Sequence, residues 1–373
     1  MRYCDNCLTT SLRPNAQFKN GVCIACLYSK TENEHVNAKE YWLASIKENI
    51  KKSRRKNAHD CIVGISGGKD SLRQALWVRD KLGVDPLLVC VSYPPKQMSE
   101  TGAQNLENII RHGFDLININ PAPETSMKLT RYCFQNFGNL CKATELALHA
   151  GVPKIAIAKG VRNILWGENP ALQVGDAGVL GDSPIDGSKH RNLNTLTEGG
   201  MDWMSCDQHK KFWYHYPTEL EFERKKIKIY YLGPVWEDWS TINNATYSMF
   251  NGLTPSPLPP LETGDLTQSS MLDEEFTNIN MLLKYFKFGF GRATDYVNEE
   301  IRNGRMSRDQ AIKIVEIYDG KCSNDIIERF CRYIEISIQE FWDVVRKYTN
   351  QDIFDCNKIG SRPEKKFIVG ENP

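Results

Sequence analysis

From Asp60 onward, short apolar segments alternate along the chain with longer amphipathic ones. The apolar segments predict five strands, at Cys61–Ile65, Leu87–Val91, Leu116–Ile119, Lys154–Ala158 and Asn163–Trp166. Apolar residues at helical spacing predict three helices between them, at Ser71–Leu82, Ser99–Arg111 and Thr125–His149. Strands that alternate with helices in this way form a parallel sheet. We therefore expect a doubly wound α/β domain that binds ligands at the carboxyl ends of its strands.

The segments on either side follow other patterns. Residues 32–56 are polar and charged, with apolar positions that suit one amphipathic helix. From Asp176 to Pro260 the chain is rich in aromatic residues, Gly and Pro, which indicates long loops over the sheet and one more strand at Ile229–Leu232. Helical spacing returns after Ser270, at Glu299–Arg302, Arg308–Tyr318 and Asn324–Tyr333, with Ser307 and Ser323 as caps.

These patterns divide the chain into four expected parts. They are a cysteine-rich segment (1–30), a helical linker (31–58), the α/β domain (59–260) and a helical C-terminal region (261–373). The 47 basic residues balance 46 acidic ones, which argues against a general polyanion binder and makes nucleic acid an unfavoured partner. The sequence has neither an apolar run of transmembrane length nor the apolar core of a signal peptide near Met1, so we expect a soluble, cytoplasmic protein that does not bind membranes.

The first four of twelve cysteines have the spacing of a zinc ribbon. Cys4 and Cys7 form one C-x2-C pair, and Cys23 and Cys26 form the second after fifteen residues. The Asn20-Gly21 dipeptide supplies the tight turn before the second pair. Because four thiolates complete the tetrahedral coordination of zinc, we expect a structural Zn²⁺ without an open position for substrate.

The strongest chemical signal is the sequence Ser66-Gly67-Gly68-Lys69-Asp70-Ser71, between a predicted strand and a predicted helix. Two glycines let the backbone approach phosphate oxygens, and the N–H groups at a helix start favour an anion. Ser66 and Ser71 add hydroxyl donors, Lys69 adds a positive charge, and Asp70 can hold Mg²⁺. The Walker A pattern is absent. This segment resembles the pyrophosphate loop of the N-type ATP pyrophosphatases, which cleave ATP between its α and β phosphates.

Two weaker signals accompany the loop. Trp166-Gly167-Glu168-Asn169-Pro170 ends a predicted strand, which places Glu168 at the carboxyl edge of the sheet, where it can share Mg²⁺ with Asp70 while Asn169 orients substrate. Farther along, Arg292, Asp295 and Arg302 lie beside small residues and a helix start. Their charges suit either an anionic sugar or nucleotide or pairing with one another, and the residues alone do not separate these alternatives.

Further motifs accompany these signals along the chain. They are Asn105-Leu106-Glu107-Asn108, Gly113-Phe114-Asp115, KFGFGRATD, Gly304-Arg305 with Arg308, and Tyr318-Asp319-Gly320-Lys321. Together with the four-cysteine ribbon, SGGKDS and GENP, they give nearly the whole chain a resemblance to the N-acetyl sugar amidotransferases of surface polysaccharide pathways, the pseudaminic acid and B-band lipopolysaccharide type. The chain departs from the family pattern after GENP, at Gln173-Val174 and in the Gly-rich segment Asp176–His190, which leaves the identity of the sugar open.

The resemblance implies an enzyme that uses ATP and Mg²⁺ to adenylylate the N-acetyl oxygen of a nucleotide-linked sugar. Ammonia then replaces that oxygen and forms an acetamidino group. On this reading the catalytic residues are Lys69, Asp70, Glu168 and Asn169, with Asp70 and Glu168 on Mg²⁺, and the substrate ligands are Arg292, Asp295 and Arg302. The sequence contains no glutaminase motif, so the family resemblance implies that a separate glutaminase and a cyclase-like barrel supply the ammonia.

Two other functions compete with this interpretation. A tRNA thiolase also combines a pyrophosphate loop with zinc knuckles, but such an enzyme often carries a further C-x2-C pair, and none follows Cys26 in this sequence. A non-catalytic nucleotide-binding adaptor is the third possibility, and the complete loop from Ser66 to Ser71 argues against it.

Overall fold

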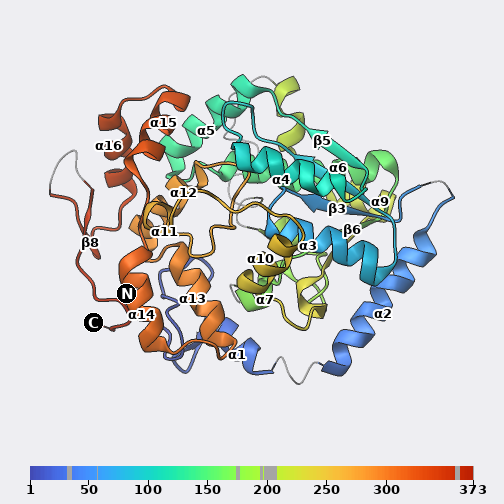
Figure 1. Ribbon diagram of the computed structural model, residues 1–373, viewed down its shortest axis with the longest axis horizontal. Helices are drawn as coiled ribbons and strands as arrows, with labels where there is room; N and C mark the ends of the chain where they lie inside the picture. Colours follow the sequence, from blue (N-terminus) through green and yellow to red (C-terminus); the bar gives the residue numbers. More distant parts are fainter. Residues whose placement is uncertain are drawn as a thin grey trace.

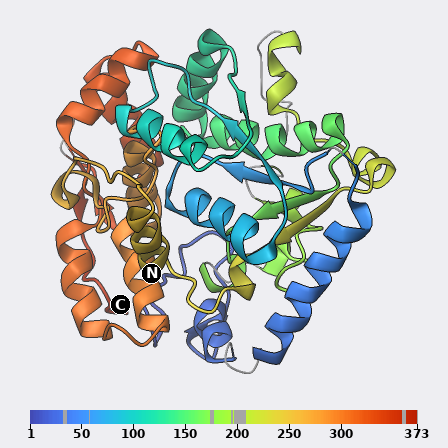
Figure 2. The ribbon, with the colours of Figure 1, turned by 45° about the vertical axis from the view of Figure 1, so that its right-hand side comes forward.

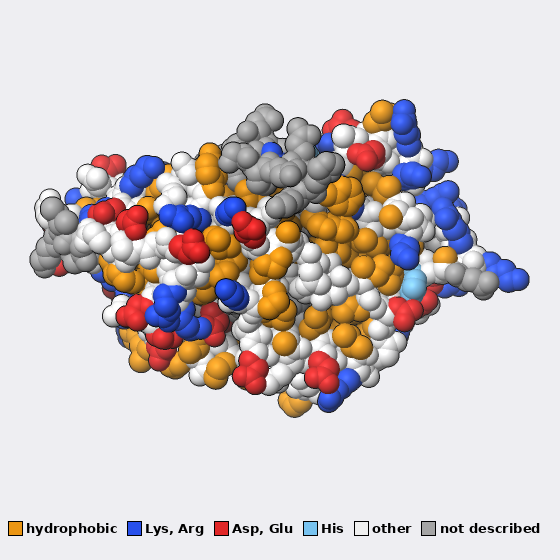
Figure 3. All heavy atoms as spheres, turned by 90° about the horizontal axis from the view of Figure 1, so that it is seen from above, with side chains coloured by type: hydrophobic (Ala, Val, Ile, Leu, Met, Phe, Trp, Pro, Cys, Tyr) orange, Lys and Arg blue, Asp and Glu red, His pale blue; other side chains and the backbone are white. Residues whose placement is uncertain are grey.

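A computed structural model describes residues 1–31, 36–56, 58–173, 177–193, 196, 208–357 and 362–372. Figures 1 and 2 show a central sheet between helices, with the C-terminal helices α12–α16 gathered along one side of it and the helix α2 (Val36–Ser53) at the other end. On the face seen in Figure 3, acidic and basic side chains intermix on the left, hydrophobic side chains gather across the middle, and basic side chains predominate at the right edge. No helix in the described ranges is long and apolar enough to cross a membrane.

Five parallel strands form the central sheet, in the order β5-β4-β3-β6-β7. Their bounds are β3 Cys61–Ile65, β4 Pro86–Val91, β5 Leu116–Ile119, β6 Asn163–Trp166 and β7 Lys228–Tyr231. The chain proceeds outward from β3 to β5 and then returns to the other side of β3 for β6 and β7. The direction of winding therefore reverses between β3 and β6, and ligands of such sheets bind in the crevice outside the strands at that point.

Helices cover both faces of this sheet, as the doubly wound prediction requires. Val63 and Ile65 of β3 join one core with α2, α3 (Lys69–Trp77) and α4 (Glu100–Arg111). Ile62, on the opposite face, joins a second core with α5 (Pro123–Phe137) and α6 (Lys142–Lys159). Strands buried on both faces carry near-continuous apolar runs, which is why the sequence pattern located β3, β4 and β6, whereas β5 is an edge strand with Asn118 exposed.

The predicted strand Lys154–Ala158 is wrong, because these residues form the end of α6. A short apolar run cannot be told from a buried helical segment by its periodicity. The predicted helix Thr125–His149 is in fact two helices. Gly138, with φ of +55°, ends α5 in the left-handed conformation, and α6 begins at Lys142. The predicted helix Ser71–Leu82 begins earlier, at Lys69, and its last turn, Val78–Leu82, is a π-helix.

The aromatic-rich region is more helical than predicted. It contains α9 (Glu219–Lys225) and α10 (Thr241–Phe250) as well as β7, and Thr218 and Ser240 cap the two helices. Short helical segments account for much of the rest: η3 Ala177–Val179, η4 His190–Asn192, η5 Gln208–Tyr214, η6 Gly233–Val235 and, at its end, α11 Pro260–Thr263. The short helix α7 (Pro170–Gln173) lies just before this region. Val174 and Trp203 lie outside the described residues.

The C-terminal region consists mainly of helices, whose two apolar clusters also include residues from elsewhere in the chain, Phe134 in one and Tyr3 and Leu8 in the other. The helices are α12 Thr277–Phe288, α13 Arg292–Arg302, α14 Arg308–Tyr318, α15 Asn324–Ile334 and α16 Ile338–Tyr348, followed by the strand pair β8 Phe354–Asp355 and β9 Glu364–Lys365. Ser307 and Ser323 cap α14 and α15 as predicted. The predicted turn Glu299–Arg302 is the end of the longer helix α13.

The N-terminal cysteine segment is a small hairpin followed by a helix. The strands β1 (Phe18–Lys19) and β2 (Val22–Cys23) are antiparallel, and α1 (Ile24–Thr31) follows. Asn20 and Gly21 both have positive φ, +50° and +82°, which confirms the predicted tight turn. The segment lies against α13, and Figure 1 shows both chain termini on this side of the molecule.

Candidate functional site

The loop from Ser66 to Ser71 lies at the point where the sheet reverses its winding. It joins β3 to α3, and β6 is the neighbour of β3 on the other side. Gly67 has a φ of +91°, and a Cβ on it would stand 3.4 Å from the backbone nitrogen of Leu106. Only glycine adopts this conformation without strain. Gly68 precedes the helix without any side-chain cap, so the start of α3 remains open to an anion.

Hydroxyl groups hold this loop in a closed turn. The Ser66 backbone N–H donates to Ser71 Oγ at 2.9 Å, and the two serine Oγ atoms are 3.3 Å apart. The Gly68 N–H approaches Ser66 Oγ at 3.4 Å. Both serines therefore shape the loop, and phosphate binding by their hydroxyl groups stays a prediction.

The charged residues of the loop are held by α10, which the sequence pattern did not single out. Lys69 Nζ donates to Asp70 Oδ2 at 2.8 Å, and Asn244 Nδ2 donates to Asp70 Oδ1 at 2.7 Å. Ser248 Oγ donates to the Lys69 carbonyl at 2.6 Å. Arg73 in turn donates to Asn244 Oδ1 at 2.6 Å. Asn244 and Ser248 are thus positioning residues for the loop, and their distance of more than 170 residues along the chain explains why no motif indicated them.

Glu168 and Asn169 follow β6 and so lie beside the loop. The Glu168 side chain is open to solvent, yet protein surrounds it closely enough to raise its pKa to about 7, and the negative charge of Asp70 adds to this rise. Two accessible carboxylates that influence each other electrostatically are suitable ligands for Mg²⁺. Asn169 is buried, and its Oδ1 accepts a hydrogen bond from the Leu172 N–H at 3.2 Å, so that this side chain supports α7.

The four cysteines Cys4, Cys7, Cys23 and Cys26 meet in one buried cluster, as their spacing predicted. Their sulfur atoms lie within 4.8 Å of one another. The sulfurs of Cys7 and Cys23 are 3.7 Å apart, close to the edge of roughly 3.8 Å that a tetrahedron with Zn–S bonds of about 2.3 Å requires. Backbone N–H groups of Asn6, Thr9 and Cys23 point at cluster sulfurs. The residues therefore fit a tetrahedral zinc ion.

Arg302 joins this cysteine cluster to the segment that follows Glu168. One of its terminal nitrogens donates to the carbonyls of Leu172 and Gln173, at 2.9 and 3.1 Å. The other donates to Thr9 Oγ1 at 3.1 Å and lies 3.8 Å from the sulfur of Cys7. A guanidinium beside a thiolate cluster offsets its negative charge. These contacts of Arg302 are all with protein groups.

The other two predicted substrate ligands also contact protein groups. Asp295 accepts from Arg13 at 2.7 Å and from Lys284 at 2.5 Å. Burial raises the pKa of Asp295, but these two cations outweigh burial and hold it below its usual range. Arg292 is buried, 3.8 Å from Asp265 and 3.4 Å from Asn278 Oδ1. Substrate binding by Arg292, Asp295 and Arg302 stays a prediction.

Replacement of Arg302 by Met should weaken zinc binding by about 10- to 100-fold, the usual effect of removing a group that supports metal ligands. Met keeps an unbranched apolar stem but removes the donors to Thr9 and to the α7 carbonyls. Competition with a chromogenic chelator measures the affinity. Arg305→Met is the matched control. Arg305 lies just beyond the end of α13, and its ion pair is with Glu300 of that helix. Equal zinc affinity in both variants would contradict the assignment.

Residues 247–367 match the family model described as LPS biosynthesis protein WbpG-like, C-terminal domain. This match covers α12 to α16 and agrees with the lipopolysaccharide part of the resemblance inferred from the motifs. The chain has no significant match among the curated proteins. Among solved structures, an NMN synthetase from Francisella tularensis aligns with 82% of this chain and 93% of its own, at 12% identity and a TM-score of 0.35. A likeness of that degree supports no inference about fold or function.

Proposed function

We propose that the chain is an ATP-dependent amidotransferase that acts on an N-acetyl sugar during lipopolysaccharide biosynthesis. The observation that carries this proposal is the meeting of the Ser66–Ser71 loop and Glu168 at the β3–β6 reversal of the sheet. An open helix start behind a glycine turn suits a pyrophosphate, and a pair of carboxylates suits its metal ion. The WbpG-like match supports the pathway.

The proposed reaction has two steps. The amide oxygen of the N-acetyl group attacks the α-phosphorus of ATP, the bond from that phosphorus to the bridging oxygen breaks, and pyrophosphate leaves with the electron pair. Ammonia then adds to the imidate carbon and loses a proton, the C–O bond breaks, and AMP leaves. An amide oxygen is a poor leaving group, whereas the same oxygen as part of AMP leaves readily.

The residues of the loop have separate roles in this reaction. The N–H groups at the start of α3 hold the departing pyrophosphate, and Lys69 adds positive charge beside it. Asp70 and Glu168 would hold Mg²⁺, which offsets negative charge on the phosphates when it is bound. Asn244 and Ser248 hold the loop in place, so these groups need little reorganisation when charge moves onto pyrophosphate.

Incubation with ATP, Mg²⁺, ammonium and a panel of nucleotide-linked N-acetyl sugars tests the proposal. The expected product is about one mass unit lighter than the sugar substrate, since NH replaces O, and AMP and pyrophosphate form in equal amounts with it. Formation of ADP and phosphate, or no product from any sugar, would contradict the proposal. A parallel incubation with tRNA and a sulfur donor tests the thiolase alternative.

We also expect the isolated chain to use free ammonium and to be inert with glutamine, because its sequence shows no glutaminase nucleophile. Only unprotonated ammonia is nucleophilic, so the rate should rise from neutral toward alkaline pH. Ionisation of Glu168, whose pKa is raised to about 7, adds to the rise in the same range, since the carboxylate is the form that binds Mg²⁺. A pH–rate series with ammonium measures this.

A change of nitrogen source separates the two causes of the expected pH dependence, which are the deprotonation of ammonium and the ionisation of Glu168. Addition of a partner glutaminase should permit glutamine use near neutral pH, where bulk ammonium is mostly protonated. Glu168→Gln should lower the rate throughout the pH range. Glutamine-dependent turnover by the highly purified single chain would contradict the prediction.

A further inference from the structure

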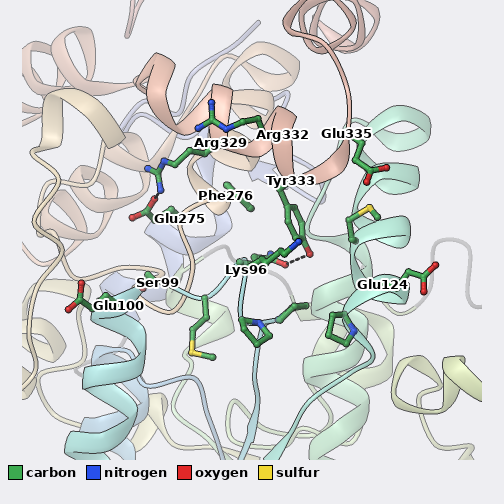
Figure 4. A pocket seen from close by; sticks show the side chains of 16 residues that line it. Lys96, Ser99, Glu100, Glu124, Glu275, Phe276, Arg329, Arg332, Tyr333 and Glu335 are labelled. Atoms are coloured by element: carbon green, nitrogen blue, oxygen red, sulfur yellow. Dashed lines mark hydrogen bonds and ion pairs between the residues drawn. The ribbon is translucent and has the colours of Figure 1, made fainter.

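A cavity of about 930 Å³ opens at the carboxyl ends of β4 and β5. Its lining comes from two parts of the chain that are far apart in sequence. Residues 94–100, after β4, and residues 123–127, at the start of α5, form one side. The C-terminal region forms the other side, with Phe276 before α12 and Arg329, Arg332 and Tyr333 on α15 (Figure 4). This second side lies within the WbpG-like match.

The cavity begins about one helical turn from the phosphate loop. Gly67 of the loop lies against Gly102 and Leu106 of α4. Ser99, which lines the cavity, caps the same helix and accepts from the Gly102 N–H at 2.8 Å. A turn of helix rises roughly 5.4 Å. The Ser99 N–H also donates to the Asp273 carbonyl at 3.0 Å, so the C-terminal region is fastened to α4 beside the loop.

The centre of the cavity is aromatic. The rings of Phe276 and Tyr333 lie 5.3 Å apart at an angle of 32°. The Tyr333 hydroxyl donates to Gln97 Oε1 at 3.2 Å, which fixes the direction of that ring. Figure 4 shows Tyr333 directed into the middle of the cavity, close to Lys96. A held aromatic ring offers a flat apolar face to a sugar or a nucleobase.

The charges around this centre are of both signs and are partly separated. Arg329 and Arg332 lie on one side in Figure 4, and Glu124 and Glu335 lie on another. Arg329 already pairs with Glu275 and Asp325. Arg332 is 68% exposed, and its nearest carboxylate, Glu328, is 4.0 Å away. Such a lining does not favour a bare polyanion. It suits a ligand with two different parts. An anionic part would contact Lys96 and Arg332, and a part rich in hydroxyl groups would donate hydrogen bonds to the carboxylates.

We propose that this cavity binds the acceptor substrate, a nucleotide-linked acetamido sugar. Its phosphates would meet Lys96 and Arg332, and a ring of the ligand would lie on Tyr333. The inference rests on the proposed function, because it places the acceptor next to the loop that is proposed to hold the pyrophosphate of ATP. It also explains why residues of the WbpG-like region line the site, since the acceptor distinguishes this reaction from other uses of the same loop.

Titration calorimetry of the full chain tests the proposal. The probes are four nucleotide-linked sugars. Three carry N-acetylglucosamine, on uridine diphosphate, thymidine diphosphate or guanosine diphosphate, and the fourth carries N-acetylneuraminate on cytidine monophosphate. We expect at least one to bind. Lys96→Glu and Arg332→Glu should each weaken that binding about tenfold or more, because each removes a charge-assisted contact and adds repulsion. Both residues are exposed, so the variants should fold. Lys313→Glu, the same reversal at an exposed position on α14 outside the cavity, should bind normally.

The outcomes separate this proposal from the proposed function. Binding of the probe that is lost in the Lys96 and Arg332 variants, with ATP affinity unchanged, supports the cavity even when the probe is not converted to product. Normal probe binding by both variants, or no binding of any probe to the wild-type chain, overturns it. The proposal is also overturned if the two variants lose only the rate increase that the glutaminase partner causes, because that result assigns the cavity to binding of the partner.

Discussion

Replacement of Asp70 by Asn is expected to reduce turnover about 10²- to 10³-fold, the usual cost of losing one charge-stabilising group at a reaction centre. The carboxylate of Asp70 accepts from Lys69 and Asn244, and it is the loop residue proposed to hold Mg²⁺. Asn removes the negative charge while it keeps the size of the side chain. Because the side chain is 43% exposed, the variant should fold normally. Steady-state release of pyrophosphate with ammonium as nucleophile measures the effect.

Two further variants define how specific this effect is. Ser66→Ala should also lower turnover strongly, because Ser66 closes the loop turn with Ser71. Asp80→Asn makes the same chemical change just after α3, at an exposed carboxylate that pairs with Arg79, and should leave the rate unchanged. Near-normal activity of Asp70→Asn, with a normal melting temperature, would refute the phosphate-loop assignment.

Replacement of Cys23 by Ser is expected to remove bound zinc and to unfold the N-terminal segment. Structural zinc contributes its binding free energy to folding, on the order of 10 kcal/mol in small zinc domains. Cys23 is one of four buried thiols that the predicted metal would bring together. The damage should spread to the candidate site around the Ser66–Ser71 loop. Asn298 and Arg302 of α13 bond to Leu8 and Thr9, and Arg302 also holds the carbonyls that follow Glu168.

Metal analysis and thermal melting of protein purified without chelator test this prediction. Cys356→Ser provides the matched control, because Cys356 lies outside the cluster and is only partly buried. We expect the control to keep its zinc and its melting temperature, and Cys23→Ser to lose both along with most of its activity. Absence of zinc from the wild-type protein would contradict the assignment of a structural metal.

Local sequence patterns predicted the parts of this protein whose structure depends on near neighbours. The apolar runs located β3, β4 and β6 closely, since a buried parallel strand must be apolar on both faces, and the shorter run Leu116–Ile119 located the edge strand β5. The cap serines located α14 and α15, because a cap bonds an N–H only three residues away. The same reasoning failed at Lys154–Ala158, where burial made a helix as apolar as a strand.

The spacing of Cys4, Cys7, Cys23 and Cys26 was sufficient to predict the four-thiol cluster, and Gly67-Gly68 was sufficient to predict a glycine turn before a helix, because each depends on a short stretch of chain. Phosphate binding by this turn stays a prediction. The position of Glu168 after a predicted strand also placed it in advance at the carboxyl edge of the sheet. Only the tertiary structure decided the other surroundings: α10 contributed Asn244 to Asp70, and α13 placed Arg302 between the cysteine cluster and α7. Each of these contacts joins residues about a hundred or more positions apart. Such contacts leave no periodicity in the sequence, because they arise from the packing of complete elements against one another.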